Sequence, residues 1–448
     1  MSEKIGFAES VSLAVGGMVG GGIFAVLGVV AEAAGPAAWT SFVVSGVLAL
    51  CAGYSFVRLI EESDSATAGP VAHVEEFTGE QWLAGVVGWV FTFGYVGTMA
   101  MYAYAFGSYG LQLVGVETAF GVAARPFVSV AGVACFVGLN ALGARASGRA
   151  EDVLVALKVL ILLVVGGAGV YYGYTQGTLQ SGLHTVGGGV VSAAALSFVA
   201  FEGWELLAFD LDSIENPRET VRKAIYASIA FTTLLYVLVA VVTTNLVSAD
   251  VIRQHAETAL AYAARPVFHE AGFALVAVAA VLSTASALNA TLFSAARLSQ
   301  QVADAAHNAP DRAASNAGDG SSDTSRAPAL DASVGSSRTA SESESSPVRA
   351  LLVLGVLTAI LTAYGSLNSI TSFASGAFIS IFGAVSAIAY TQRESVVSAV
   401  VPAAGAVGSA VALLALFWHL HRTSPDVLAT VATIWAVVLA VYWLPRRE

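Results

Sequence analysis

Charged residues, and lysine above all, are scarce in this chain. Only 11% of its 448 residues are charged, the net charge is −11, and Lys4, Lys158 and Lys223 are its only lysines. So little charge excludes an ordinary soluble globular protein. A nucleic-acid partner is not expected either, because such binding relies on clustered basic residues.

Cysteine and the motifs of catalysis are also nearly absent. Cys51 and Cys135 lie inside apolar runs without metal-ligand spacing, so they are most simply small packing residues, and neither a metal nor another cofactor is expected. No Gly-x-Ser-x-Gly elbow, zinc motif or pair of intramembrane aspartates indicates an intramembrane enzyme. A channel remains an alternative, although no ion-filter motif is evident.

Long apolar runs dominate what is present. Each is long enough to cross a hydrocarbon core of about 30 Å, and most are joined by short connections. We therefore predict an all-α polytopic membrane protein with twelve transmembrane helices. The runs cover residues 9–33, 37–59, 82–112, 126–145, 152–173, 190–212, 224–248, 266–296, 349–364, 368–390, 396–419 and 426–444.

The basic residues are distributed unevenly between the connections. If the N-terminus is cytoplasmic, every basic residue outside the spans falls on the inner side apart from four arginines. This asymmetry follows the positive-inside rule, so we expect a protein of the cell membrane with both termini in the cytoplasm. The four arginines on the outer side are Arg125, Arg253, Arg265 and Arg422.

One connection, residues 305–348, differs from the others. It is rich in Ser, Asp, Ala and Gly, and no aromatic residue occurs between Phe293 and Tyr364. Such a segment cannot bury enough apolar surface to become ordered. We expect a disordered cytoplasmic loop that separates eight helices in residues 1–304 from four in residues 349–448, within one membrane domain.

The first run contains an unusual glycine cluster, "VGGMVGGGIF" at residues 15–24. Close packing against another helix would explain small residues spaced four apart. Three successive glycines, Gly20 to Gly22, instead favour an unwound break at the middle of the membrane, where free backbone N–H groups can hold an anion. We expect such a break.

A second break is expected five spans later if the fold is an inverted repeat. The sixth run reads "LSFVAFEGWELLAFD" and carries Gly203 between Glu202 and Glu205. Carboxylates in the middle of a span are costly in lipid and indicate a functional site. Hydrogen bonding of these carboxylates to neighbouring helices is the structural alternative.

These motifs together resemble the amino acid–polyamine–organocation (APC) superfamily. The similarity rests on "GGMVGGGIF", "FVAFEGWELLAFDLDSIENPRETVRKAI", "LSTASALNATLFSAAR" and "NALGARASGRAEDVLVALKVLILLVV", which keep the family order over roughly residues 6–395. The resemblance implies five helices plus an inverted five, with helices 1 and 6 interrupted and two further helices at the C-terminus. It also implies a permease that moves amino acids by alternating access.

The resemblance also implies a substrate site between the two interrupted helices. Opposed broken helices offer an anion site and a cation site to a zwitterion. Phe201 and Trp204 would be gate or pocket-wall aromatics, with ordinary core packing as the alternative. The carboxylate would be held by backbone amides of Gly20, Gly21 and Gly22, and the amino group by carbonyls of Met18, Val199, Ala200 and Glu202.

Glu202 departs from the family pattern, in which an apolar residue is more common. If its carboxylate faces the site, a cationic substrate side chain would be favoured. Neutral and cationic amino acids therefore both remain open as substrates, and the oligomeric state is not indicated.

Lys158 is the residue that bears most on energy coupling. It is the only lysine inside a span. In some sodium-independent members of the family that the chain resembles, a similar fifth-helix lysine occupies the place where sodium binds in sodium-coupled members. We therefore expect proton coupling without sodium, with Glu205 as a second coupling candidate. Snorkelling of Lys158 to the interface is the structural alternative. The functional alternatives are an amino acid/polyamine exchanger and a sodium symporter of the same fold that uses Ser283, Thr284 and Ser286.

Overall fold

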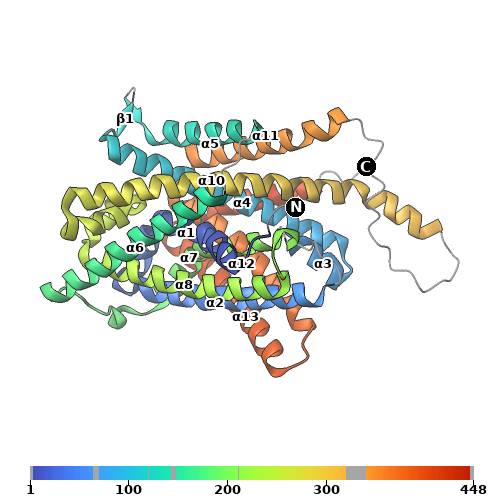
Figure 1. Cartoon of the computed structure of the whole chain (residues 1–448), viewed down its shortest axis with the longest axis horizontal. Helices are drawn as coiled ribbons and strands as arrows, with labels where there is room; N and C mark the ends of the chain where they lie inside the picture. Colours follow the sequence, from blue (N-terminus) through green and yellow to red (C-terminus); the bar gives the residue numbers. More distant parts are fainter. Residues whose placement is uncertain are drawn as a thin grey trace.

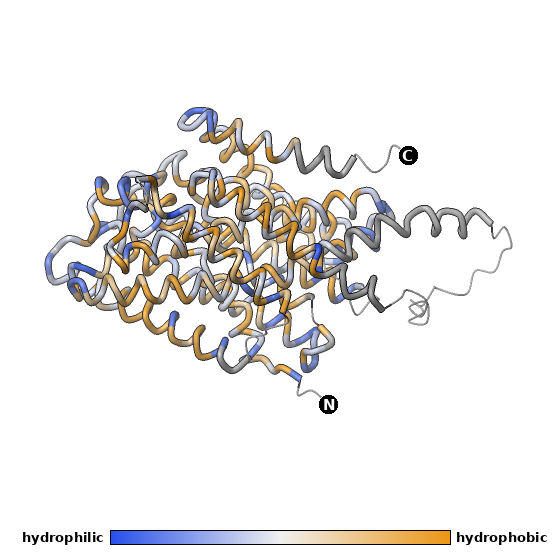
Figure 2. The backbone as a smooth tube through the Cα atoms, turned by 90° about the horizontal axis from the view of Figure 1, so that it is seen from above, coloured by the Kyte–Doolittle hydropathy of each residue, from blue (hydrophilic) through white to orange (hydrophobic). Residues whose placement is uncertain are grey.

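The structure is a computed structural model of the chain, and it describes residues 4–63, 70–119, 121–142, 148–209, 211–318 and 340–443. Long helices lie roughly side by side along the long axis of the molecule (Figure 1). Hydrophilic positions gather towards the two ends of the bundle, and hydrophobic positions fill the length between them (Figure 2). This distribution suits a bundle whose long axis crosses a membrane.

The first half of the chain forms seven α-helices and a two-stranded hairpin among the described residues. The hairpin pairs Thr118 with Ala123 in antiparallel register. The elements are α1 (Phe7–Ala34), α2 (Ala38–Glu62), α3 (Pro70–Thr78), α4 (Gln81–Val114), β1 (Thr118–Ala119), β2 (Val122–Ala123), α5 (Arg125–Ala141), α6 (Gly148–Gln176) and α7 (Gly188–Ser197), with short 3-10 helices η1 (Gly35–Ala37) and η2 (Leu183–Thr185).

The second half begins with a run of short 3-10 helices and continues with long α-helices. Helix α10 kinks at His269, where φ is 55°. The elements are η3 (Phe198–Phe201), η4 (Trp204–Phe209), η5 (Leu211–Ser213), α8 (Pro217–Leu246), α9 (Ala249–Gln254), η6 (Ala256–Thr258), α10 (Ala259–Gly318), α11 (Ala340–Tyr364), α12 (Leu367–Thr391), α13 (Val396–Thr423) and α14 (Pro425–Trp443).

Helices lie at each of the predicted apolar runs. Among the described residues, seven helical stretches are long and apolar enough to cross a membrane, the first of them running through both α1 and α2. Four shorter apolar helices accompany them. The all-helical prediction is confirmed, whereas the twelve-span count and the inverted repeat stay predictions.

The segment 305–348 was expected to be disordered, and the helices extend into it from both sides. Helix α10 continues to Gly318, and α11 begins at Ala340. Residues 319–339 lie outside the described residues. The division of the chain at this segment therefore stays a prediction.

Helix α1 lies in the middle of the bundle (Figure 1). It packs against α8, α10, α7 and α6, and most of its residues from Ala14 to Ala34 are buried. Its own glycines let neighbouring segments approach its backbone closely. Any site on α1 is therefore enclosed by protein rather than by lipid.

The N-terminal residues join the beginning of α1 to the segment that follows η5. The amide of Ile5 donates to the carbonyl of Ser213 at 2.9 Å, and the amide of Glu215 donates to the carbonyl of Ile5 at 2.9 Å. Ser12 donates to Asp152 at the start of α6 at 2.6 Å. Three elements are thus joined at this end of the bundle.

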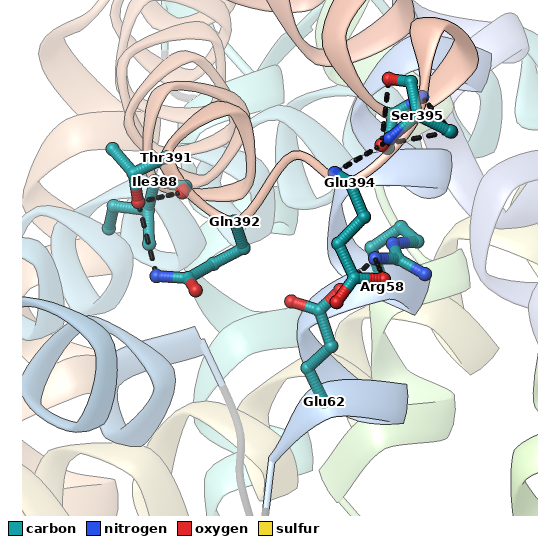
Figure 3. Close-up of polar contacts among 8 residues, drawn as sticks. Arg58, Glu62, Ile388, Thr391, Gln392, Glu394 and Ser395 are labelled. Atoms are coloured by element: carbon teal, nitrogen blue, oxygen red, sulfur yellow. Dashed lines mark hydrogen bonds and ion pairs between the residues drawn. The ribbon is translucent and has the colours of Figure 1, made fainter.

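A charged cluster joins α2 to the turn between α12 and α13 at the same end (Figure 3). The Arg58 guanidinium pairs with Glu62 one helical turn later and lies 3.7 Å from the Glu394 carboxylate. Ser395 caps α13 by accepting a hydrogen bond from the Ser398 amide at 3.2 Å. These contacts fix the turn against the end of α2.

His73 on α3 is fully buried between Phe56 and Phe77. Neither ring nitrogen has a hydrogen-bond partner among the described residues. Burial lowers the pKa of His73 to about 4, and the nearby Glu76 opposes this only in part. The folded protein therefore keeps this imidazole neutral at pH values where an unfolded chain would protonate it.

Acidification is therefore expected to destabilise the fold through His73. Below the unfolded pKa of about 6.5, the unfolded chain binds a proton that the folded chain does not, so stability falls from pH 6.5 down to about 4. The loss at pH 5 is about 2 kcal/mol. His73→Phe should shrink the fall in melting temperature between pH 7.5 and 5, measured in detergent. His184→Gln, at an exposed position, should leave it unchanged, and an unaltered fall in His73→Phe would contradict this account.

Candidate functional site

The sixth apolar run is interrupted, as predicted. Helix α7 ends at Ser197 and is followed by the 3-10 helix η3. Glu202 is extended, with ψ of 143°, and Gly203 has φ of 127°, a value that L-residues rarely adopt. A second 3-10 helix, η4, then continues the chain. The break therefore needs glycine at position 203.

The expected break in the first run is wrong for this conformation. Helix α1 runs without interruption from Phe7 to Ala34, through Gly20, Gly21 and Gly22. A continuous helix uses these amides for its own hydrogen bonds. They are not free to hold an anion here.

Close packing explains the glycines of α1 instead. A Cβ added at Gly17 would lie 2.8 Å from the Cα of Gly203, and one added at Gly22 would lie 2.7 Å from the Cα of Ala200. A Cβ at Gly21 would lie 2.1 Å from the ring of Tyr102. The helix tolerates these glycines, at about 1 kcal/mol each, because the interrupted segment packs directly onto Gly17 and Gly22, and α4 packs onto Gly21.

Serines from two neighbouring helices satisfy the backbone near the interruption. Ser375 of α12 accepts a hydrogen bond from the Val199 amide at 3.2 Å and donates to the Leu196 carbonyl at 2.8 Å. Ser45 of α2 lies 2.7 Å from the Ala194 carbonyl and 2.6 Å from the Ser197 hydroxyl. These bonds hold α7 and η3 without helical continuity.

Tyr236 of α8 joins the two segments at the centre. Its hydroxyl lies 2.6 Å from the Met18 carbonyl of α1 and 2.8 Å from the Ala200 carbonyl of η3. A phenol has a single proton, so it donates to only one of the two at a time. The two carbonyls, both predicted to hold a substrate amino group, thus converge on one donor atom.

Both carboxylates of the interruption are buried and face tyrosines of α4. The Tyr102 hydroxyl donates to Glu202 at 3.1 Å, and the Tyr95 hydroxyl donates to Glu205 at 3.4 Å. Glu205 also accepts from the Gly203 amide at 2.8 Å, across the interruption. Because the Tyr102 ring lies against Gly21, this pair connects Glu202 to the glycine face of α1.

Lys158 is 5% exposed and does not snorkel towards an interface in this conformation. Its ammonium donates to the Gly16 carbonyl of α1 at 2.8 Å. Nearby, Ser283 of α10 donates to the Val19 carbonyl at 2.8 Å. Lys158 and Glu205, the two coupling candidates, therefore contact different partners.

Phe201 and Trp204 are fully buried packing residues here. The Phe201 ring lies 5.3 Å from that of Tyr236, and Trp204 lies 5.5 Å from Phe56 and 4.8 Å from Phe382, centroid to centroid. Their role as gate residues is not tested by this packing. It stays a prediction.

Sequence reasoning missed the tyrosines and serines that complete the site. Tyr95, Tyr102, Tyr236 and Ser375 each supply a hydroxyl to the interruption or to its carboxylates. Polar side chains inside apolar runs were the available signal, but the chain has many of them. Among the described residues, no group of three or more His, Cys, Asp or Glu side chains could hold a metal ion.

The geometry defines a class of protein. An enclosed central helix, a second helix interrupted beside it and intramembrane carboxylates are the features of a secondary transporter. A manganese transporter from Eremococcus coleocola shares the fold, with a TM-score of 0.56 and 11% identity over 97% of this chain and 92% of that one. The two chains therefore share a fold.

Sequence comparison then gives the family. The profile of the amino acid permease family matches residues 5–441, so the chain belongs to that family. An uncharacterized protein of Methanocaldococcus jannaschii is 32% identical over 67% of this chain and 69% of its own.

Two bacterial relatives carry transport names. The inner membrane transport protein YbaT of Escherichia coli is 31% identical over 65% of this chain and 67% of its own. The branched-chain amino acid permease BcaP of Bacillus subtilis is 28% identical over 55% and 56%. The chain is thus a multi-pass membrane permease.

Proposed function

We propose that this permease carries amino acids across the cell membrane by alternating access, driven by protons and without sodium. The observation that carries the proposal is the convergence of the Met18 and Ala200 carbonyls on the Tyr236 hydroxyl, between α1 and the interruption. Two converging carbonyls suit an ammonium, which is the cationic end of every amino acid. The five-plus-five repeat, twelve spans and cytoplasmic termini are part of this proposal.

The substrate carboxylate would bind the amides of Gly20, Gly21 and Gly22 after α1 unwinds there. Non-helical backbone is tolerated at membrane depth where protein encloses it and other groups satisfy it. Donors from two helices already contact carbonyls of α1 beside the glycines: Lys158 of α6 at Gly16 and Ser283 of α10 at Val19. These contacts lower the free energy needed to unwind the helix.

The remaining predicted residues line the same region. The carbonyls of Val199 and Glu202 lie in the interruption with that of Ala200, and Phe201 and Trp204 would close it as gate aromatics. Glu202, bonded to Tyr102 across the glycine face, would favour a cationic substrate if it turns towards the ligand. Glu205 is a second candidate for proton coupling.

Proton coupling is assigned mainly to Lys158. Its ammonium lies at the Gly16 carbonyl, beside the Ser283 hydroxyl that a sodium ion would need as a ligand. A sodium ion and an ammonium would compete for this place. Loss of the proton would replace this charge-assisted hydrogen bond with the weaker one of a neutral amine, which links protonation to the hold on α1.

Removing the Tyr236 hydroxyl is expected to tighten amino acid binding. The hydroxyl competes with the substrate ammonium for the Met18 and Ala200 carbonyls. Since one hydrogen bond contributes about 1 kcal/mol, Tyr236→Phe should lower Kd by roughly fivefold. The measurement is amino acid binding by thermal shift, alongside uptake into empty proteoliposomes.

Tyr109→Phe is the matched control. The hydroxyl of Tyr109, on α4, donates to the Phe24 carbonyl of α1 at 3.1 Å, away from the interruption. An equal change in both variants would remove the assignment of the amino group to the Met18 and Ala200 carbonyls. Failure of every amino acid to enter proteoliposomes, whether empty or preloaded to allow exchange, would overturn the transport proposal itself.

A further inference from the structure

A pocket lies between α4, α10 and α11, outside the proposed transport site. These three helices are neighbours in the bundle (Figure 1). The pocket has a volume of about 220 Å³. Its walls are formed mainly by Trp89 and Phe93 of α4, Ser299 of α10, and Arg349, Val353 and Leu357 of α11.

The pocket is polar at one end and apolar along its length. Ser299 is the last residue of the apolar stretch Ala256–Ser299, and Arg349 is the second residue of the apolar stretch Val348–Tyr364. Leu357 lies eight residues further along α11, which corresponds to about 12 Å. Arg349 is exposed and forms no ion pair with any described residue. The pocket therefore has one cationic residue, Arg349, at one end and apolar walls along the rest of its length.

The pocket is open towards the lipid rather than towards the centre of the protein. Val353 is 59% exposed, and its neighbours Leu352 and Val356 are also exposed apolar residues. On α4, the tyrosines that meet the two carboxylates are Tyr95 and Tyr102, neither of which lines this pocket. A ligand here would enter from the bilayer, separately from the substrate.

We propose that this pocket binds one anionic phospholipid from the leaflet at the Arg349 end. The phosphate would pair with the Arg349 guanidinium, for which a bidentate geometry is available. One acyl chain would lie between Trp89, Phe93 and Leu357. The order of groups in the pocket, cation at the membrane surface and hydrocarbon below it, matches the order of groups in such a lipid.

Charge decides between this lipid and other occupants. A zwitterionic phospholipid offers the same chains and phosphate, but its positively charged choline group opposes the attraction of the phosphate to Arg349. Oleate offers one acyl chain and a carboxylate in place of the phosphate. It has no second chain to pack over the exposed Val353 and Val356. Under the proposed orientation, the leaflet is the cytoplasmic one, which carries anionic lipids in many membranes.

Native mass spectrometry of the full chain in detergent tests the proposal, with dioleoyl phosphatidylglycerol and dioleoyl phosphatidylcholine as probes. The wild type should retain phosphatidylglycerol more strongly. One arginine near a membrane surface contributes about 1 kcal/mol, so Arg349→Gln should weaken phosphatidylglycerol binding by roughly fivefold. Arg297→Gln is the matched control, because Arg297 is exposed on α10 outside the pocket and contacts the Phe293 ring. It should change binding by less than about twofold.

A second variant tests the apolar walls without changing charge. Ala350 lines the pocket, so Ala350→Leu should fill part of it and reduce phosphatidylglycerol retention while leaving the melting temperature similar. Equal retention of both phospholipids by the wild type would overturn the proposal. So would equal losses in Arg349→Gln and Arg297→Gln, or full displacement of phosphatidylglycerol by equimolar oleate. None of these outcomes depends on whether the protein transports amino acids.

Discussion

Lys158→Ala is expected to reduce uptake driven by a pH gradient strongly while amino acid binding remains measurable. The buried ammonium donates to the Gly16 carbonyl of α1, and no other described charged group bonds that carbonyl. Removing a charged donor costs about 1.5–3 kcal/mol, so proton-driven uptake should fall roughly tenfold or more. The measurement is uptake into proteoliposomes under an imposed pH gradient, with binding followed by thermal shift.

Lys223→Ala is the control for this result. Lys223 is an exposed lysine of α8 that pairs with Glu219 at 2.6 Å, so its loss removes a lysine without touching the site. Sodium-driven uptake by the wild type would refute proton coupling through Lys158. A Lys158→Ala protein with an unchanged pH profile would leave the buried lysine with a purely structural role.

Gly203→Ala is expected to disrupt the fold at the interruption. The new Cβ would lie 2.7 Å from the backbone of Gly17 and Met18, where no flexible side chain can move aside. The φ of 127° adds strain of about 1–3 kcal/mol for any L-residue. We expect a large fall in melting temperature and in the yield of folded protein, measured by fluorescence-detected size-exclusion chromatography.

Gly17→Ala and Gly167→Ala provide the comparison. Gly17 forms the other side of the same contact, so Gly17→Ala should resemble Gly203→Ala, and the double variant should be less damaging than the sum of the two. Gly167 in α6 faces open space, so alanine there should be neutral or stabilising by about 0.5–1 kcal/mol. A well-folded Gly203→Ala protein would mean that the backbones can separate at little cost.

The helices and the interruption of the sixth run could be predicted from sequence for a simple reason. Apolar length determines spans in lipid, and Gly203 between two carboxylates is incompatible with an ordinary lipid-facing helix. An interruption of α1 was predicted from Gly20 to Gly22, but the helix is continuous. Glycines in a helix serve close packing as well as unwinding, so the glycine cluster alone does not distinguish the two. Sequence alone does not show that Ala200 and Gly203 pack against Gly22 and Gly17.

The side-chain partners could not be predicted, because they depend on tertiary contacts between distant segments. Tyr236 reaches Met18 from 218 positions away, and Lys158 reaches Gly16 from 142. The number of intramembrane tyrosines and serines makes any one of them a weak signal. The coupling role of Lys158 was predicted from a family resemblance and not from its contacts. The burial of Lys158 excludes snorkelling in this conformation.

The backbone bonds of Ile5 have a mechanical consequence. They fasten the first residues of the chain to the stretch just beyond the interrupted segment, through Ser213 and Glu215. These bonds connect the beginning of α1 to the end of the sixth span, so a tilt of one would be transmitted to the other. Under the proposed alternating access, α1 and this stretch of the sixth span would therefore move as one unit, with the glycine contacts between Gly17 and Gly203 as the hinge.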